Sequence, residues 1–200
     1  MKFLLLFLIS IALYGSSKTA LEAYKSHEYK KAFILYKEAA QSGDVTSQNA
    51  LSYLYFNGIG TTISKKNGLI WLKKAADSGD IRACFDFGMM LLSGINIEKD
   101  FTKAARYLQI ASDKDDNEAT YNLALMYYNG DGVKQDLKKA ASLLEKAAKA
   151  GHVGAKHNVG RVYMSALNFK KAKFWLSENV KDGDEQAATL LKEIKAANKE

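Results

Sequence analysis

The sequence predicts an all-α fold, an α-solenoid of antiparallel helix hairpins, and three observations carry this prediction. A small residue recurs three times at intervals of 36 residues and once more after 32, at Ser47, Ala83, Ala119, Ala155 and Ala187. Apolar residues near these positions recur at i, i+4 and i+8, which is the periodicity of an amphipathic helix. The chain contains no proline, as expected where nearly every segment is helical. A fixed period of this length is typical of solenoids, in which each unit stacks on its neighbours.

The first segment of each unit has one consistent pattern. An apolar residue stands four positions after the start, and a small residue follows it directly, at Ser52, Gly88, Ala124 and Gly160. A bulky residue comes three positions later, at Tyr55, Leu91, Tyr127 and Tyr163. Aspartate precedes several of the helical runs, which predicts N-caps at Asp44, Asp80, Asp100, Asp136 and Asp184.

The second segment of each unit follows a glycine-containing loop, such as residues 57–60 or 129–132. It carries a small residue and, three residues later, an apolar pair, as in Trp71-Leu72. Small residues let two helices approach closely, so we expect the two segments of each unit to form a helical hairpin. Stacking of the hairpins then supplies the core. We expect one solenoid domain, residues 18–200, made of hairpins at about 20–43, 44–79, 80–116, 117–151 and 152–183 and a capping helix at 184–200.

Residues Ala119–Val133, followed by Asp136–Ala140 and Glu145–Ala148, resemble a Sel1-like repeat. The resemblance covers roughly Ala20 to the C-terminus, and it implies a right-handed solenoid related to the tetratricopeptide repeat. The end hairpins are more similar to tetratricopeptide hairpins, because the last interval is 32 residues instead of 36. The resemblance to this family also implies that the protein binds other proteins on the concave side of the solenoid.

The N-terminus reads as a secretory signal peptide. Lys2 precedes a 12-residue apolar run, Phe3–Tyr14, and the small residues Gly15 to Ser17 follow. We therefore expect residues 1–17 to be removed and the protein to be exported, either to the periplasm or out of the cell. An uncleaved membrane anchor is the open alternative, although a spanning helix needs about 20 apolar residues.

No arrangement of residues points to catalysis, a cofactor or a metal. His152 and His157 are five apart across a helix start, which is poor metal-ligand spacing. No serine is followed three residues later by lysine, so the nucleophile motif of serine β-lactamases is absent. We expect no enzyme. The alternative that stays open is a cell-envelope hydrolase, because some exported relatives with paired cysteines have been labelled β-lactamases.

Cys84 is the only cysteine, so the chain lacks the cysteine pairs that close each hairpin in some exported Sel1-like proteins. Packing must therefore stabilise the fold without disulfides. Cys84 stands at a position that Gln48, Thr120 and Lys156 fill in other units. These polar equivalents predict that Cys84 is partly exposed.

The first helices are expected to line the concave face, if the geometry implied by the resemblance holds. The predicted partner-binding residues on this face are Asn49, Tyr53, Phe56, Phe85, Met89, Tyr121, Leu125, Tyr128, His157 and Arg161. Tyrosine, phenylalanine, methionine and arginine are enriched where proteins bury a partner. The other interpretation is that individual aromatics pack against the next hairpin. The polar-tipped members tolerate water, so the most available side chains are expected to be Tyr53, Tyr121, Tyr128, His157 and Arg161.

These features predict an exported adaptor that binds a protein or peptide. The formal net charge of +7 favours an acidic partner. No nucleic-acid motif is present, and we expect a monomer without a stable membrane anchor after signal cleavage. A scaffold that self-associates through its ends is a weaker alternative, because the C-terminal segment 185–200 is highly charged, as a solubilising cap should be.

Overall fold

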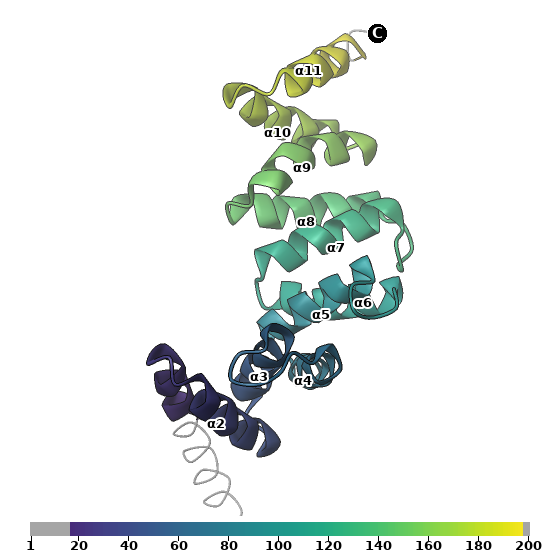
Figure 1. Cartoon of the computed structure of the whole chain (residues 1–200). Helices are drawn as coiled ribbons and strands as arrows, with labels where there is room; N and C mark the ends of the chain where they lie inside the picture. Colours follow the sequence, from purple (N-terminus) through teal and green to yellow (C-terminus); the bar gives the residue numbers. More distant parts are fainter. Residues whose placement is uncertain (1–16, 198–200) are drawn as a thin grey trace, which may run out of the picture. The chain divides into compact units, whose positions relative to one another are not determined.

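The computed structural model describes residues 17–197, and its regular structure is helical (Figure 1). Residues 17–25 form a first helix. It is followed by α2 (Tyr29–Gln41), α3 (Val45–Asn57), α4 (Lys65–Asp77), α5 (Ile81–Ser93), α6 (Phe101–Asp113), α7 (Asn117–Asn129), α8 (Leu137–Lys149), α9 (Val153–Ser165), α10 (Phe169–Lys181) and α11 (Glu185–Ala197). The prediction of an all-α helical-repeat fold is confirmed. The predicted signal peptide lies outside the described residues except for Ser17.

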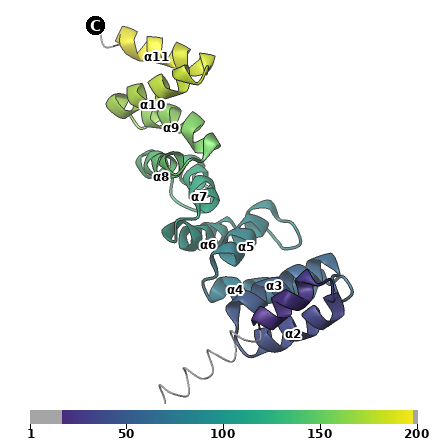
Figure 2. The ribbon, with the colours of Figure 1, turned by 90° about the vertical axis from the view of Figure 1, so that its left-hand side faces the viewer.

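The chain divides into two compact units, Met1–Glu98 (unit 1) and Lys99–Glu200 (unit 2). In unit 1, α2 packs on α3, α3 on α4 and α4 on α5. In unit 2, each helix from α6 to α11 packs on the next one along the chain (Figure 2). The boundary falls in the loop between α5 and α6, inside the segment 80–116 that we expect to form one hairpin, so the division into hairpins stays a prediction.

Helix starts follow the predicted capping chemistry. All five predicted caps accept a hydrogen bond from the backbone N–H three residues later, at donor–acceptor distances of 2.6–2.9 Å. They are Asp44, Asp80, Asp100, Asp136 and Asp184. Four further caps were not predicted, namely Ser64, Asp116, His152 and Asn168. Helix ends differ between hairpins, since Gly58, Gly94 and Gly130 end α3, α5 and α7 in the left-handed conformation but α9 ends at Ala166 without one.

Close approach of paired helices depends on the small residues. A Cβ atom at Gly160 of α9 would stand 2.9 Å from the Leu176 side chain of α10, so only glycine fits there. A Cβ atom at Gly68 of α4 would stand 2.9 Å from the ring of Phe56. Each unit has its own buried core, which includes Tyr36, Leu51 and Leu54 in unit 1 and Leu144, Val159, Trp175 and Leu176 in unit 2. Full burial of such a side chain contributes about 1.5–3 kcal/mol.

Candidate protein-interaction surface

Two cavities open beside α3 in unit 1. The larger, of about 580 Å³, is bounded by α3, α4 and α5, and the smaller, of about 470 Å³, by helix 17–25, α2, α3 and α5. Both cavities are lined by Asn49, Tyr53 and Asp86, so they adjoin each other. We call this depression the unit 1 groove. Its other lining residues include Leu21, Tyr24, Tyr36, Phe56, Arg82, Met89 and Met90.

Tyr53 stands between the two halves of the unit 1 groove and is 54% exposed. Tyr24 lines the smaller half beside it. Partial burial, together with the neighbouring hydroxyl of Tyr53, raises the pKa of Tyr24 above its ordinary value, so Tyr24 stays neutral at physiological pH. The two rings offer apolar area for a partner, and their hydroxyl groups can bind water when no partner is present.

Polar groups border the apolar part of the groove. On α5, the Arg82 Nε donates to the Asp86 Oδ2 at 3.0 Å, one helical turn away. The Asn49 Nδ2 donates to the Asp80 Oδ1 at 3.0 Å, so Asn49 also ties α3 to the N-terminus of α5. The exposed Lys65 lies at the start of α4 and lines the larger half. The groove therefore combines apolar side chains with a few charged and amide groups, as binding clefts commonly do.

Most predicted site residues of unit 1 lie together. Those that line the groove are Asn49, Tyr53, Phe56 and Met89. Phe56 also packs inside its hairpin, since its ring lies against Gly68. Phe85 lines neither half of the groove, and its ring lies 5.7 Å from the guanidinium carbon of Arg82.

Tyr121 of unit 2 contacts the next hairpin. Its ring stacks on the His152 imidazole with the centroids 4.3 Å apart, and its hydroxyl accepts a hydrogen bond from the Asn158 Nδ2 at 3.2 Å. His152 is the N-cap of α9, where its Nδ1 accepts from the backbone N–H of Ala155 at 3.0 Å. The side chain of Tyr121 is therefore half-buried between α7 and α9, in contrast to the availability expected for it. Farther along α7, Leu125 is half-buried and Tyr128 is exposed.

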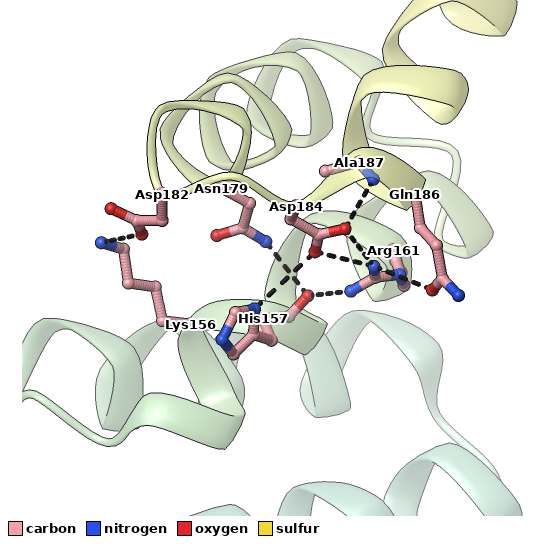
Figure 3. Close-up of polar contacts among 8 residues, drawn as sticks. All are labelled: Lys156, His157, Arg161, Asn179, Asp182, Asp184, Gln186 and Ala187. Carbon is pink, nitrogen blue, oxygen red and sulfur yellow. Dashed lines mark hydrogen bonds and ion pairs between the residues drawn. The ribbon is translucent and has the colours of Figure 1, made fainter.

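Arg161 and His157 of α9 are also engaged within the chain (Figure 3). The Nη2 of Arg161 donates to both carboxylate oxygens of Asp184, at 2.8 and 3.1 Å, and to the Gln186 Oε1 at 3.2 Å. The His157 Nδ1 lies 3.7 Å from the Asp184 Oδ2. The hydrogen bond from the Ala187 backbone, aided by Arg161, lowers the pKa of Asp184 below its ordinary value. The start of α11 thus engages the Arg161 side chain, whereas His157 stays exposed beside Asp184.

The expected partial exposure of Cys84 is wrong, because the residue is 0% exposed. Its Sγ donates to the Ala76 carbonyl oxygen at 3.2 Å, at the end of the preceding helix. The equivalent Gln48 is buried and donates to the Ala40 carbonyl oxygen at 3.4 Å, and the equivalent Thr120 is fully buried. For Cys84 and Gln48, the polar character of this position therefore reflects a hydrogen bond to the end of the previous helix instead of exposure.

Sequence reasoning missed several lining residues of the unit 1 groove. Arg82, Asp86 and Met90 are spaced four apart on α5 and lie on one helix face, so the spacing that predicted Met89 also points to them. Tyr24 carries no such signal, because its helix precedes the first regular repeat.

Unit 2 holds the strongest charge cluster of the described residues. The Glu145 carboxylate of α8 accepts from the Lys149 Nζ at 2.8 Å, from the Lys171 Nζ at 2.6 Å and from the Tyr163 hydroxyl. Burial alone raises the pKa of Glu145, but these three donors outweigh it and lower the pKa to about 2. A carboxylate with such a pKa is a weak base at neutral pH, so the cluster ties α8, α9 and α10 together instead of moving protons.

Residues 17–197 contain no group of three or more histidine, cysteine or acidic side chains that is arranged to hold a metal ion. Within the same range, no helix is both long and apolar enough to cross a membrane.

Solved structures share the fold of this chain. The c5321 protective antigen of uropathogenic Escherichia coli, which has an SLR fold, is 25% identical over 82% of this chain, with a TM-score of 0.71. A Sel1 repeat protein from Oxalobacter formigenes is 26% identical over 88% of this chain, with a TM-score of 0.67. The chain spans 36% of the length of the first protein and 75% of the second. None of the curated proteins is significantly similar to it.

The model of the Sel1 repeat matches residues 25–44, 45–80, 81–116 and 117–152, which is more than half of the chain. Proteins with this repeat are typically scaffolds for protein interaction and are generally not enzymes. The chain belongs to the Sel1 repeat family.

Proposed function

We propose that this protein is an exported adaptor that holds a peptide or protein segment in the unit 1 groove. The observation that carries this proposal is the pair of adjoining cavities with an exposed tyrosine between them, lined by predicted partner-binding residues. A Sel1 repeat protein is expected to use such a surface for binding rather than catalysis.

The occupant of the groove is an extended or helical segment with at least two large apolar side chains, one for each half. Tyr53 and Met89 contact one side chain and Tyr24 and Leu21 the other. Lys65 and Arg82 add positive charge at the border, which favours an acidic residue beside the apolar anchors. In unit 2, Leu125, Tyr128 and the exposed His157 remain the candidates for secondary partner contacts, since Tyr121 and Arg161 contact other parts of the fold.

Crosslinking in living cells followed by affinity capture tests the groove. We expect Tyr53→Ala to lower the yield of a specific partner at least tenfold, because loss of a central aromatic anchor costs about 2 kcal/mol or more. The matched control is Ile70→Ala on α4, which removes another exposed apolar side chain that does not line the groove. Equal capture by wild type and Tyr53→Ala, with helical content unchanged, would contradict the proposal.

Export is proposed from the N-terminal sequence alone, with the periplasm or the medium as the destination. Mass spectrometry of the protein from fractionated cells tests it. The expected result is an exported form that begins at Lys18, whereas an intact N-terminus in the membrane fraction would indicate the uncleaved anchor instead.

A further inference from the structure

Two of the three long hairpin loops in the described part of the chain place a glycine against the first residue of the preceding second helix, whereas the third has Asn96, with φ of +63°, at the same repeat position. Gly60 lies against Tyr29, the first residue of α2, where a Cβ atom would stand 2.1 Å from the Tyr29 carbonyl oxygen. Gly132 lies against Phe101, the first residue of α6, where a Cβ atom would stand 2.3 Å from the carbonyl carbon. Both glycines are left-handed, with φ of +70° and +67°. The starts of α2 in unit 1 and α6 in unit 2 are thus niches for a glycine turn.

The start of α8 has no such loop on it. The connection between α9 and α10 is only residues 166–168, four residues shorter than the regular loop. A groove of about 840 Å³ lies there instead, which we call the α8 groove. It is lined by Tyr127, residues 133–139 and residues 165–167. Leu137, the first residue of α8, lines this groove, at the place where the backbones of Tyr29 and Phe101 carry a loop glycine.

Positive charge surrounds the α8 groove. Lys134, Lys138 and Lys139 line it, and all three are exposed. The Nζ of Lys139 donates to the Tyr127 hydroxyl at 2.6 Å, while Lys134 and Lys138 make no ion pair within residues 17–197. The Asp136 carboxylate caps α8 by accepting from the Lys139 N–H at 2.9 Å. The lining thus has more cationic than anionic groups.

The short loop adds an apolar rim. Leu167 is 75% exposed and has a φ of +59°, a conformation that a leucine rarely adopts. The lining therefore combines the exposed apolar side chain of Leu167 with three lysines.

We propose that the α8 groove is a second docking site, which accepts an acidic, glycine-containing turn from a partner protein. The chain itself displays the geometry of the occupant, because Gly60 and Gly132 fill the same niche at α2 and α6. The lysines supply the charge that an acidic turn would complement. This site is separate from the unit 1 groove and does not depend on it.

The test uses a cyclic peptide that copies the loop Asn129–Val133, Asn-Gly-Asp-Gly-Val, with the purified isotope-labelled protein. Nuclear magnetic resonance should show saturable amide shifts confined to residues 133–139 and 165–168. Double charge reversal, Lys134→Glu with Lys138→Glu, should weaken binding at least fivefold. The matched control is Lys66→Glu, because Lys66 is the second residue of α4 as Lys138 is the second residue of α8.

A loop graft supplies the decisive variant. Replacing Ala166-Leu167-Asn168 by Gly-Asp-Gly-Val-Lys-Gln-Asp restores the regular loop length, so the grafted loop should fill the niche and abolish peptide binding. Unchanged binding by the graft, or no shift in the wild type, would overturn the proposal. Inorganic phosphate that causes the same shifts at equal concentration would also overturn it, since the site would then select charge alone.

Discussion

The first helices of the hairpins carry the same repeat positions in both units, but the side chains at these positions have different surroundings in unit 1 and unit 2. Tyr53 in unit 1 and Arg161 in unit 2 are equivalent residues of their repeats. Tyr53 is exposed between two cavities, whereas Arg161 is bound to the Asp184 carboxylate at the start of α11. The backbone pattern that makes a solenoid therefore does not decide which repeats can bind a partner. Whether a repeat has a free surface depends on the side chains at a few variable positions and on whether a neighbouring helix of the same chain contacts them.

The C-terminal helix explains the difference. Asp184 is an N-cap like Asp44 and Asp80, but its carboxylate also pairs with the charged guanidinium of Arg161, which has several N–H donors where a tyrosine has one O–H. Farther along α11, Lys192 stands at the position that the small Ser52 occupies in α3, and it is exposed.

The largest loss of stability in unit 2 is expected from a substitution at a loop glycine. Gly132→Ala puts a methyl group onto the Phe101 backbone in a left-handed conformation, so we expect a loss of about 3 kcal/mol in unfolding free energy. Gly151→Ala is the control, because its φ is also positive but no atom lies within 4 Å of the new methyl group. The control should lose about 1 kcal/mol. Denaturant unfolding measures both, and equal losses would contradict the close loop contact.

The Glu145 cluster comes next. Glu145→Gln removes the charge that holds Lys149, Lys171 and Tyr163, and we expect a loss of about 2 kcal/mol in unfolding free energy. Because the folded pKa of about 2 lies below the ordinary value of 4.5, this stabilisation is complete above pH 4.5 and is lost as the pH falls toward 2. The Gln variant should lack that part of the acid sensitivity. An acid transition of unit 2 that is identical in both proteins would contradict this assignment.

Arg161→Ala sharpens the comparison directly. Loss of the paired Asp184 contact should lower the unfolding free energy by about 1 kcal/mol and speed hydrogen exchange in α11, because the pair is partly buried. Partner capture should stay within twofold of wild type. Lys156→Ala, which breaks a more exposed pair with Asp182, is the control and should change stability by less than about 0.5 kcal/mol. A large fall in capture by the Arg161 variant would assign the partner site to unit 2.

The smallest effect is expected at Cys84 in unit 1. Its buried thiol should resist alkylation in the native protein and react at the rate at which unit 1 opens. Mass spectrometry after timed labelling measures this, with the denatured protein as the reference. Rapid native labelling would mean that the end of α4 and the start of α5 are not packed as described.

Local rules made the fold predictable from the sequence. The aspartate caps depend on neighbouring residues along one helix, and they were confirmed. The 36-residue period depends on positions that can be counted along the chain, and it was confirmed as well. Cys84 and Arg161 were harder to predict, because their surroundings depend on which carbonyl or carboxylate a second helix brings close. The short loop at 166–168 is visible in the sequence, yet the α8 groove that it leaves requires knowledge of where the regular loops rest.

The most direct test of the central claim is photocrosslinking in living cells from two equivalent positions. Met89 lines the unit 1 groove, and Leu125 holds the same repeat position in unit 2. A photoreactive amino acid at position 89 should form a specific adduct with a partner protein, and the same amino acid at position 125, which is at most a secondary contact, should give no more than a tenth of that yield. Equal adducts at both positions, or an adduct at 125 alone, would contradict the assignment of binding to unit 1.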